Sequence, residues 1–176
     1  MPNKEDTRFS IKGELTDEIR YKDGRVEIRK DHNLVVNSIL NLFNALLKGE
    51  DDYVGIAYWA VGQGLASWDS SLPNPNPTDT QLTREIGRVA ILPTDMKYVT
   101  SGNNYSETPT NILEISHTFE ENDCNGTWRE FGIFGGDATS VKDSGVMIDK
   151  INHKVLIKTD VMKVKRTIRL TLTIIR

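Results

Sequence analysis

The sequence of 176 residues has a single cysteine, no long apolar stretch and little net charge. With Cys124 alone, no intrachain disulfide can form, and the cysteine pairs of a Cys-rich zinc site are missing. No apolar run approaches the ~18 residues of a membrane helix, and residues 1–10 lack the apolar core of a secretory signal. We therefore expect a protein that folds in a reducing cytoplasm, is held together by packing and has no membrane partner.

Neither sign of charge is in large excess, since 27% of the residues are charged but the formal net charge is only -3. The C-terminal stretch is the exception, because Asp160 is its only acidic residue between Lys150 and Arg176. Its basic residues are Lys150, Lys154, Lys158, Lys163, Lys165, Arg166, Arg169 and Arg176. No aromatic residue is interleaved with them, which disfavours nucleic-acid binding. They form either a solvated strand face that discourages aggregation or a basic patch that meets an acidic neighbour in an assembly.

Sequence motifs of phosphoryl, acyl and metalloprotease chemistry are also missing. The turn Gly62-Gln63-Gly64 begins like a nucleotide-binding loop, but Ser67 stands in the place of the third glycine. A proline-rich segment then follows where the helix of such a site should begin. We therefore expect no phosphate site at this turn.

Metal-binding patterns are similarly incomplete. Glu121, Asp123 and Asn125 resemble the start of a calcium loop, but Gly132 occupies the position of the bidentate carboxylate. A tight turn is the better interpretation, because Asp and Asn bond their own backbone in turns.

The histidines lie far apart in sequence, and none has a second ligand close by; they are His32, His117 and His153. Cys124 lies in a polar turn without an orienting motif for a nucleophile. The sequence thus predicts no catalytic residue, no metal, no cofactor and no enzymatic activity.

An alternating apolar pattern runs to Asp23-Gly24 and resumes after it, which is a strong signal for a β-hairpin. A two-residue loop would pair Tyr21 with Val26. The same register would place Arg20 opposite Glu27, a favourable charge pair. We expect an antiparallel hairpin over Ile11 to Ile28.

One segment changes to helical periodicity. Its apolar residues follow the i, i+3, i+4 rule and are Ile39, Leu42, Phe43, Leu46 and Leu47. Asn37 is the expected N-cap and Gly49 the expected end. This short amphipathic helix should cover one face of a β-sheet, and an exposed docking helix is the alternative.

The remaining pattern is one of short strands separated by turns. The expected strands are Tyr53 to Val61, Glu85 to Leu92, Met96 to Thr100, Ile112 to Phe119, Trp128 to Phe134, Val146 to Ile151, Val155 to Lys158 and Val164 to Ile174. Such spacing is typical of antiparallel proteins. We expect a mainly β protein, an antiparallel β-sandwich or barrel with one short helix.

Two segments lack the pattern of a folded element. Residues 1–10 are charged and polar, and the loop at residues 69–79 has prolines at 73, 75 and 77, which exclude a central strand. We expect a flexible arm at 1–10 and a single β-rich domain at 11–176. Both this arm and the segment Trp68 to Thr78 are predicted to gain order only against neighbouring subunits.

Four segments carry a resemblance to a known group of proteins. They are Asn33-Leu34-Val35-Val36-Asn37, Tyr58 to Gly64, Thr78 to Arg88 and Trp128 to Phe134. From about Phe9 to the end, the chain resembles small virion proteins of tailed phages, namely tail, tail-fibre-associated or baseplate proteins. The resemblance implies an antiparallel β domain that acts as an adaptor or ring-forming piece in the virion, with its function residing in its interfaces.

The same resemblance implies that the partners are other virion structural proteins and further copies of the chain in a symmetric ring or collar. The protein would be made in the host cytoplasm and reside in the virion. Competing interpretations are a carbohydrate-binding module for host-surface recognition, a head or neck decoration protein, and a small hydrolase.

Large aromatic residues are candidates for interface anchors. Trp59, Trp68 and Trp128 are of the type enriched at interface centres, although such residues are more often simply part of the core. An exposed Trp68 in the proline-rich region would also suit a sugar site.

Charged residues near the glycine turn are the second group of candidates. Arg84, Glu85 and Arg88 lie close to it in sequence, and Arg129 adjoins Glu130. These residues could form charge-assisted contacts that fix one loop on another, or surface ion pairs of little energetic value.

Overall fold

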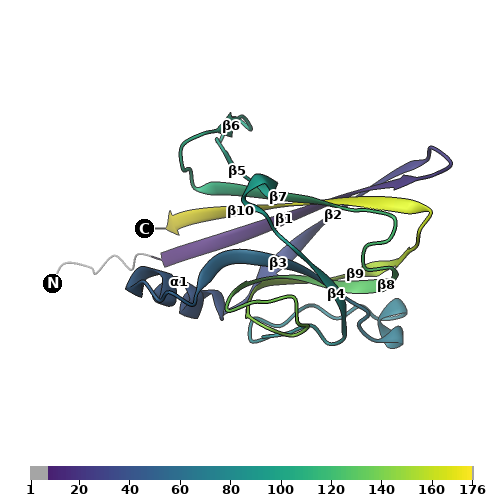
Figure 1. Cartoon of the computed structure of the whole chain (residues 1–176), viewed down its shortest axis with the longest axis horizontal. Coiled ribbons are helices and arrows are strands. Elements are labelled where there is room, and N and C mark those ends of the chain that lie inside the picture. The colour runs from purple at the N-terminus through teal and green to yellow at the C-terminus, as the bar shows by residue number, and fades with distance from the viewer. Residues whose placement is uncertain (1–7, 176) are drawn as a thin grey trace.

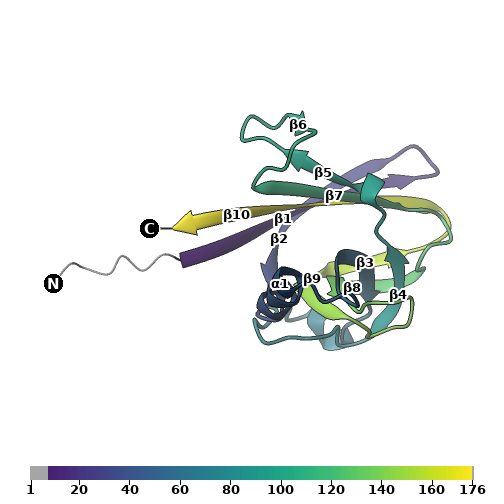
Figure 2. The same cartoon turned by 60° about the vertical axis from the view of Figure 1, so that its left-hand side comes forward.

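The structure, a computed structural model, describes residues 8–175 as a mainly β protein. Ten antiparallel strands form one sheet in the order β4-β3-β8-β9-β2-β1-β10-β7-β5-β6. Figures 1 and 2 show that this sheet curls into a half-barrel, with helix α1 lying beside its lower part. The predicted fold class, an antiparallel sandwich or barrel with one short helix, is confirmed.

The strands follow the predicted segments closely. Their bounds are β1 Arg8–Tyr21, β2 Val26–Val35, β3 Val54–Gly62, β4 Glu85–Ala90, β5 Met96–Val99, β6 Tyr105–Ser106, β7 Ile112–Phe119, β8 Gly126–Gly136, β9 Val146–Lys158 and β10 Met162–Ile175. Two short 3-10 turns, Ala66–Asp69 and Pro93–Asp95, interrupt the loops. The two strands predicted at 146–151 and 155–158 are one continuous strand, since the polar residues between them stay in β9.

The hairpin predicted at Asp23-Gly24 is present, but its predicted register is wrong by one residue. Val26 lies opposite Arg20 instead of Tyr21. Since side chains alternate along a strand, Tyr21 and Val26 face opposite sides of the sheet. The predicted pair of Arg20 with Glu27 does not form, and Glu27 instead accepts a hydrogen bond of 3.2 Å from the Tyr21 hydroxyl.

The turn itself explains the shift. The amide of Tyr21 donates to the carbonyl of Arg25 at 3.0 Å, and the amide of Gly24 donates to the carbonyl of Tyr21 at 3.0 Å. The loop therefore has three residues, Lys22 to Gly24, and Gly24 takes the left-handed position with φ of 88°. Three-residue hairpin loops place glycine at that position, whereas the prediction assumed a two-residue loop.

Strands β1 and β10 form the longest ladder in the sheet. They pair along their whole length, from Arg8 with Ile175 to Tyr21 with Met162. Strand β10 also pairs with β7, and β1 with β2, so the two strands from opposite ends of the described chain lie at the centre of the sheet. This pairing fixes the wall of the half-barrel.

Helix α1, Ile39–Lys48, ends at Gly49 as predicted, with φ of 78° at that glycine. Its N-cap is Ser38 rather than Asn37, and the Ser38 side chain makes no capping hydrogen bond. The Ser38 hydroxyl instead donates to the Met147 carbonyl at 2.6 Å, which ties the helix to β9. Ile39 and Leu42 are buried in the core. Among the described residues, no helix is long and apolar enough to cross a membrane.

The core fills the inside of the curl. Trp59 and Phe131 have ring centroids 5.1 Å apart, and Phe119 and Trp128 have theirs 5.0 Å apart. All four side chains are fully buried. Burial of such large apolar surfaces is the main source of the fold's stability.

The proline-rich loop at residues 69–79 is an extended segment without a strand, as predicted. Its own domain holds it: Asn37 donates its amide to the Pro77 carbonyl at 2.8 Å, and the Asn152 side chain donates to the Pro73 carbonyl at 3.0 Å. These contacts come from the chain itself and not from a neighbouring subunit. That Trp68 to Thr78 gains order only against neighbouring subunits stays a prediction. Of the predicted arm 1–10, residues 1–7 lie outside the described residues, and Arg8 to Ser10 begin β1.

The sheet is almost interrupted between β2 and β9. Their ladder consists of Leu34 with Lys150 and Val35 with Asp149. Within the described chain, no ladder joins residues 26–33 of β2 to residues 152–158 of β9. We call the space between these two edges the β2–β9 opening.

Candidate functional site

A fully buried carboxylate, that of Glu130 on β8, organises the loops at one end of the half-barrel. One of its oxygens accepts the amides of Gly64 at 3.1 Å and Arg84 at 2.8 Å. The other accepts the amide of Thr83 at 2.9 Å. The glycine turn thus directs its amide at the protein's own anion, and this supports the expectation that no phosphate binds there.

Two further contacts complete this arrangement. A Cβ atom on Gly62 would lie 2.5 Å from the Glu130 side chain, so glycine is required for the close approach. The ammonium of Lys150 lies 3.6 Å from Glu130 and 3.0 Å from Asp79. Since Lys150 is buried, it neutralises a carboxylate that would be costly to bury alone.

Arg129 holds the segment that contains Trp68. Its guanidinium makes two hydrogen bonds of 2.7 Å to the Asp69 carboxylate and donates to the Gln63 carbonyl at 3.2 Å. The hydrogen bonds from Arg129 hold the pKa of Asp69 below its ordinary value. This forked geometry is the strong form of a charge-assisted contact, although the Asp69 side chain is 44% exposed and is screened by solvent.

Glu85 and Arg88 form a buried pair that serves another loop. Arg88 donates to both Glu85 oxygens, at 2.7 and 2.8 Å, and to the carbonyls of Thr139 and Ser144 at 2.9 and 3.1 Å. The amide of Asp143 donates to Glu85 at 3.0 Å. The alternative of a weak surface pair is therefore excluded here, because both side chains are almost completely buried.

The predicted charged residues thus do fix loops, but within the chain itself. Arg129 and Glu130 act together around the glycine turn, Arg84 contributes its backbone, and Glu85 with Arg88 acts on the loop at residues 137–145. These contacts shape the surface at this end. A direct role of these side chains in binding a partner stays a prediction.

The tryptophans divide between core and surface. Trp59 and Trp128 are 0% exposed, so they are core residues and offer nothing to a partner. Trp68 is half-buried, with its ring against Gly64, where a Cβ atom would meet the ring at 2.6 Å. Only Trp68 of the three keeps some surface.

The turn that resembles a calcium loop holds a lysine instead of a metal. The ammonium of Lys158 donates to the carbonyls of Glu120 at 2.6 Å and Glu121 at 3.1 Å. It also donates to the Asn125 side chain at 3.0 Å. Lys158 is 1% exposed, and burial lowers its pKa from the ordinary value. The oxygens of this turn are thus used by an internal cation, consistent with the prediction of a tight turn.

The residues considered for nucleophilic or metal chemistry remain apart. Burial raises the pKa of Cys124 to about 11, which disfavours the thiolate. Burial, together with the charge of Arg166, lowers the pKa of His153 to about 4. His117 lies 3.8 Å from Asp95, and His32 is exposed. In residues 8–175, no group of His, Cys, Asp and Glu is arranged to hold a metal ion.

Sequence reasoning missed the buried charges inside the half-barrel. Arg166 on β10 binds both oxygens of Asp17 on β1, at 2.7 and 2.6 Å, and stacks over Phe131 at 4.5 Å. Asp149 is completely buried, and burial raises its pKa to about 7. The signal was present, because Asp17 and Arg166 each occupy a core-facing position in an alternating apolar series.

Most of the basic C-terminal residues are used internally. Those with acidic or carbonyl partners are Lys150, Lys158, Lys163, Arg166 and Arg169. Lys154 and Lys165 are exposed and make no ion pair within the described chain. Arg176 lies outside the described residues. A continuous basic face therefore does not form, and only isolated lysines are available to an acidic partner.

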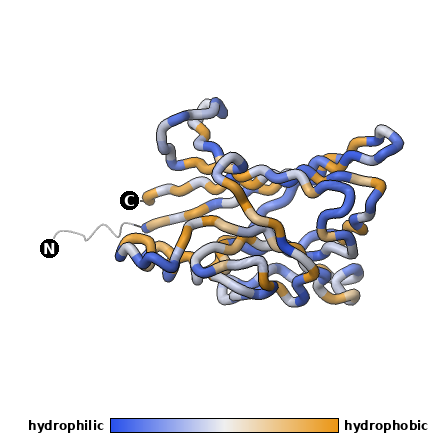
Figure 3. Tube along the Cα trace, in the orientation of Figure 1, coloured by the Kyte–Doolittle hydropathy of each residue, from blue (hydrophilic) through white to orange (hydrophobic). Residues whose placement is uncertain are grey.

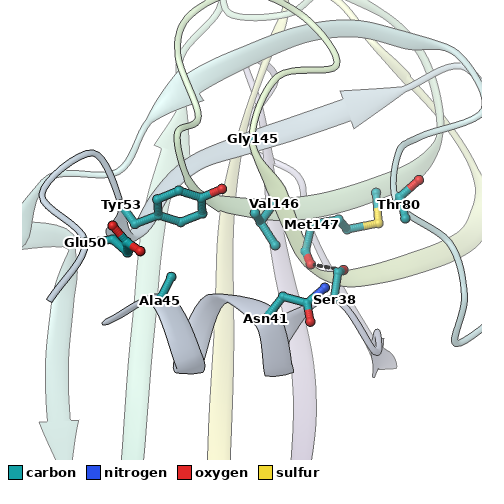
Figure 4. A pocket seen from close by; sticks show the side chains of 9 residues that line it. All are labelled: Ser38, Asn41, Ala45, Glu50, Tyr53, Thr80, Gly145, Val146 and Met147. Atoms are coloured by element: carbon teal, nitrogen blue, oxygen red, sulfur yellow. Dashed lines mark hydrogen bonds between the residues drawn. The ribbon is translucent and has the colours of Figure 1, made fainter. Parts of the chain in front are cut away.

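A cavity of about 370 Å³ lies between α1 and the loop before β9 (Figure 4). Tyr53 and Asn41 point toward it from opposite ends, while Ser38 is tied to Met147. Glu50 and Thr80 complete its polar rim. Small neutral side chains predominate, and they provide no reactive pair.

Apolar side chains are exposed at the end where β1, β10 and α1 meet. Phe9 is 49% exposed, and Ile174, which pairs with it, is 66% exposed. Leu40 and Leu47 on α1 are 53% and 87% exposed, and Phe43 packs edge-on against Phe9 at 5.8 Å. We call these five residues the apolar end; Figure 3 shows hydrophobic colour on α1 and on the end of β10.

Comparison with known proteins gave no match, either to a family model or to a curated protein.

Proposed function

We propose that this chain is a non-enzymatic structural component of a tailed-phage virion. It acts as a tail, baseplate or tail-fibre adaptor through protein–protein interfaces. The proposal rests on the sequence resemblance from about Phe9 onward and on the antiparallel β architecture, which is the fold expected for such a piece.

The apolar end is the observation that carries the proposal. A soluble monomer rarely leaves several large apolar side chains exposed together, and such patches mark interaction sites. Leu47 is 87% exposed although it belongs to a helix whose Ile39 and Leu42 are buried in the core. Helix α1 therefore both covers the sheet and presents an apolar ridge, combining the two alternatives that its sequence allowed.

In an assembly, the simplest partner for the apolar end is another copy of the same chain in a ring. A heterologous contact between one apolar end and a different surface of the next copy closes into a ring when the rotation is favourable. The charged contacts formed by Arg88 and Arg129 hold loops of the same chain in place.

The decisive experiment locates the chain in native particles. We expect mass spectrometry of purified virions to contain it, and cryo-electron microscopy density to place it at the tail or baseplate. Its absence from particles would overturn the proposal, and density at the head surface would favour a decoration protein instead.

A matched pair of variants tests the apolar end. Leu40→Ser with Leu47→Ser should abolish incorporation into particles, while Leu92→Ser with Val141→Ser, which are exposed elsewhere, should leave it unchanged. Circular dichroism checks that both double variants fold. Equal incorporation of the two would show that this surface is not the contact.

A sugar-binding module remains the rival from another class. Trp68 is the residue that suggested it, but part of its ring is covered by the glycine turn. A glycan array with the purified chain separates the two functions, because an adaptor should give no dose-dependent binding to any glycan.

A further inference from the structure

Two strand edges face each other across the β2–β9 opening. Residues 26–33 of β2 pair with β1 on one side and with no strand on the other, within the described chain. Residues 152–158 of β9 pair with β8 in the same one-sided manner. Unpaired strand edges carry rows of free amides and carbonyls, which are templates for a further strand.

One side chain bridges the two edges. Arg29 on β2 donates from its guanidinium to the backbone carbonyl of Val155 on β9, at 3.2 Å. This bond shows that the Val155 carbonyl points toward β2 and is open to a donor. The two edges are thus oriented toward one another but are too far apart to pair directly.

The opening holds a cavity of about 630 Å³. Leu15, Leu72 and Val155 provide apolar lining, and Asp17 and His153 are among its polar residues. The Nδ1 atom of His153 lies 2.8 Å from the Lys154 carbonyl and must therefore carry the proton. Its Nε2 atom is an acceptor that is buried without a partner, which is costly unless a donor is supplied.

Exposed lysines border the opening on both sides. Lys30 lies on β2 and Lys154 on β9, and neither makes an ion pair in residues 8–175. Glu27 is neutralised by Arg29 at 2.6 Å. Asp31 also borders the opening and makes no ion pair in the described chain, so the unpaired charges there are Lys30 and Lys154 against Asp31. This excess of positive charge favours an acidic ligand.

We propose that the β2–β9 opening receives an extended, acidic segment of a partner protein, which adds as a strand between β2 and β9. Its backbone pairs with both edges, and its outward side chains meet Lys30 and Lys154. Arg29 releases the Val155 carbonyl as the segment enters. Strand addition of this kind draws affinity from the main chain and specificity from alternate side chains. This inference rests on the proposed adaptor function and names the partner chemistry of one interface.

A ten-residue synthetic peptide of alternating threonine and glutamate, labelled with a fluorophore, is the probe. Fluorescence anisotropy with the full chain should show saturable binding, and the matched threonine–lysine peptide should not bind. Hydrogen exchange should show new protection at residues 26–33 and 152–158. Absence of binding, or protection elsewhere, would overturn the inference.

Variants separate a specific site from general charge attraction. Lys30→Gln with Lys154→Gln should weaken binding about tenfold, whereas Lys12→Gln with Lys165→Gln, at exposed lysines elsewhere, should have little effect. Equal weakening by both pairs would overturn the inference, as would displacement of the peptide by a glycan that protects the same residues.

The result is independent of the test of the proposed function. If the chain is found in particles but the peptide does not bind, the adaptor function stands and the strand addition is lost. If the peptide binds but the chain is absent from virions, the strand addition stands and the adaptor function is lost.

Discussion

Arg166 and Asp17 form a two-pronged ion pair inside the half-barrel, joining the two central strands β10 and β1. Both residues are buried, at 0% and 3% exposure. The remaining nitrogen of the guanidinium, Nη1, has no hydrogen-bond partner in the described chain. The cost of burying two charges offsets much of their attraction, so the pair adds little net stability. Its main effect is to favour one register of β1 against β10.

Breaking this pair on one side should be strongly destabilising. Asp17→Ala leaves the Arg166 charge buried alone, and we expect a loss of ~3–5 kcal/mol in the free energy of unfolding. The double variant Asp17→Leu with Arg166→Met removes both charges and should recover most of that loss. Urea denaturation measures each value; a double variant as unstable as the single one would show that the pair is a net stabiliser.

Asp149 should make stability fall as pH rises. Burial raises its folded pKa to about 7, above the ordinary value of 3.8, so the native state binds the extra proton between these values. The native state is thus favoured at the acidic end of this window, with a slope of up to ~1.4 kcal/mol per pH unit. In denaturation curves, Asp149→Asn should remove this falling contribution, so that the stability of the variant rises with pH across the window because of His153. Asn33 can rotate to accept from the new amide, since its own carbonyl oxygen has no partner now.

His153 should act in the opposite direction. Its folded pKa of about 4 lies below the ordinary value of 6.5, so the unfolded state binds the extra proton between them and stability rises with pH there. The wild-type profile should consequently be nearly flat in this window, because Asp149 opposes it. His153→Gln should reveal the fall of stability with pH that Asp149 causes. Stability that does not change with pH in either single variant would contradict the opposing contributions of Asp149 and His153.

Glu130 should control the attachment of the glycine turn and the segment at 83–84. Glu130→Ala removes the acceptor of three amides and leaves Lys150 without one of its partners. We expect faster hydrogen exchange at Gly64, Thr83 and Arg84, and faster proteolysis of the proline-rich loop. Glu120→Ala, which breaks an exposed pair with Lys163, is the control and should change neither.

Gly24 should resist replacement because of its backbone conformation. Gly24→Val forces a β-branched residue to a φ of 88° and should cost about 1–2 kcal/mol, although nothing lies near the new Cβ atom. Gly55→Val is a matched control, since its Cβ would also be free of contacts but its φ is ordinary. Thermal unfolding should separate the two variants, and equal effects would point to the side chain rather than to strain.

Local patterns predicted most of the elements but not how they are arranged. The strand at Ile112–Phe119 has the bounds expected from its sequence, and α1 ends at Gly49 as expected. The hairpin register could not be fixed, because Asp-Gly suits both two-residue and three-residue loops. The neighbours of β1 could not be foreseen either, since its pairing with β10 depends on contacts between distant parts of the chain.

The sequence indicated which residues form the site but not which residues they contact. Arg129 and Glu130 were expected to fix loops, and they do. Their partners Asp69 and Gly64 lie 60 and 66 residues away in sequence, so no local pattern could identify them. The pair of Asp17 and Arg166 is separated by 149 residues, so only the folded chain brings it together. A charged residue in a core-facing position of an alternating strand is the signal that would have pointed to it.

The pairing of β1 with β10 has a consequence for synthesis. During translation β1 and β2 can close their hairpin early, whereas the other side of β1 must wait until almost all of the described chain has left the ribosome. The sheet therefore cannot be completed from the N-terminus onward, and such distant pairing makes folding slow. In the meantime the apolar face of the hairpin, which includes Leu15 and Ile19, is open to misassociation, so production at low temperature or with chaperones should raise the yield of folded protein.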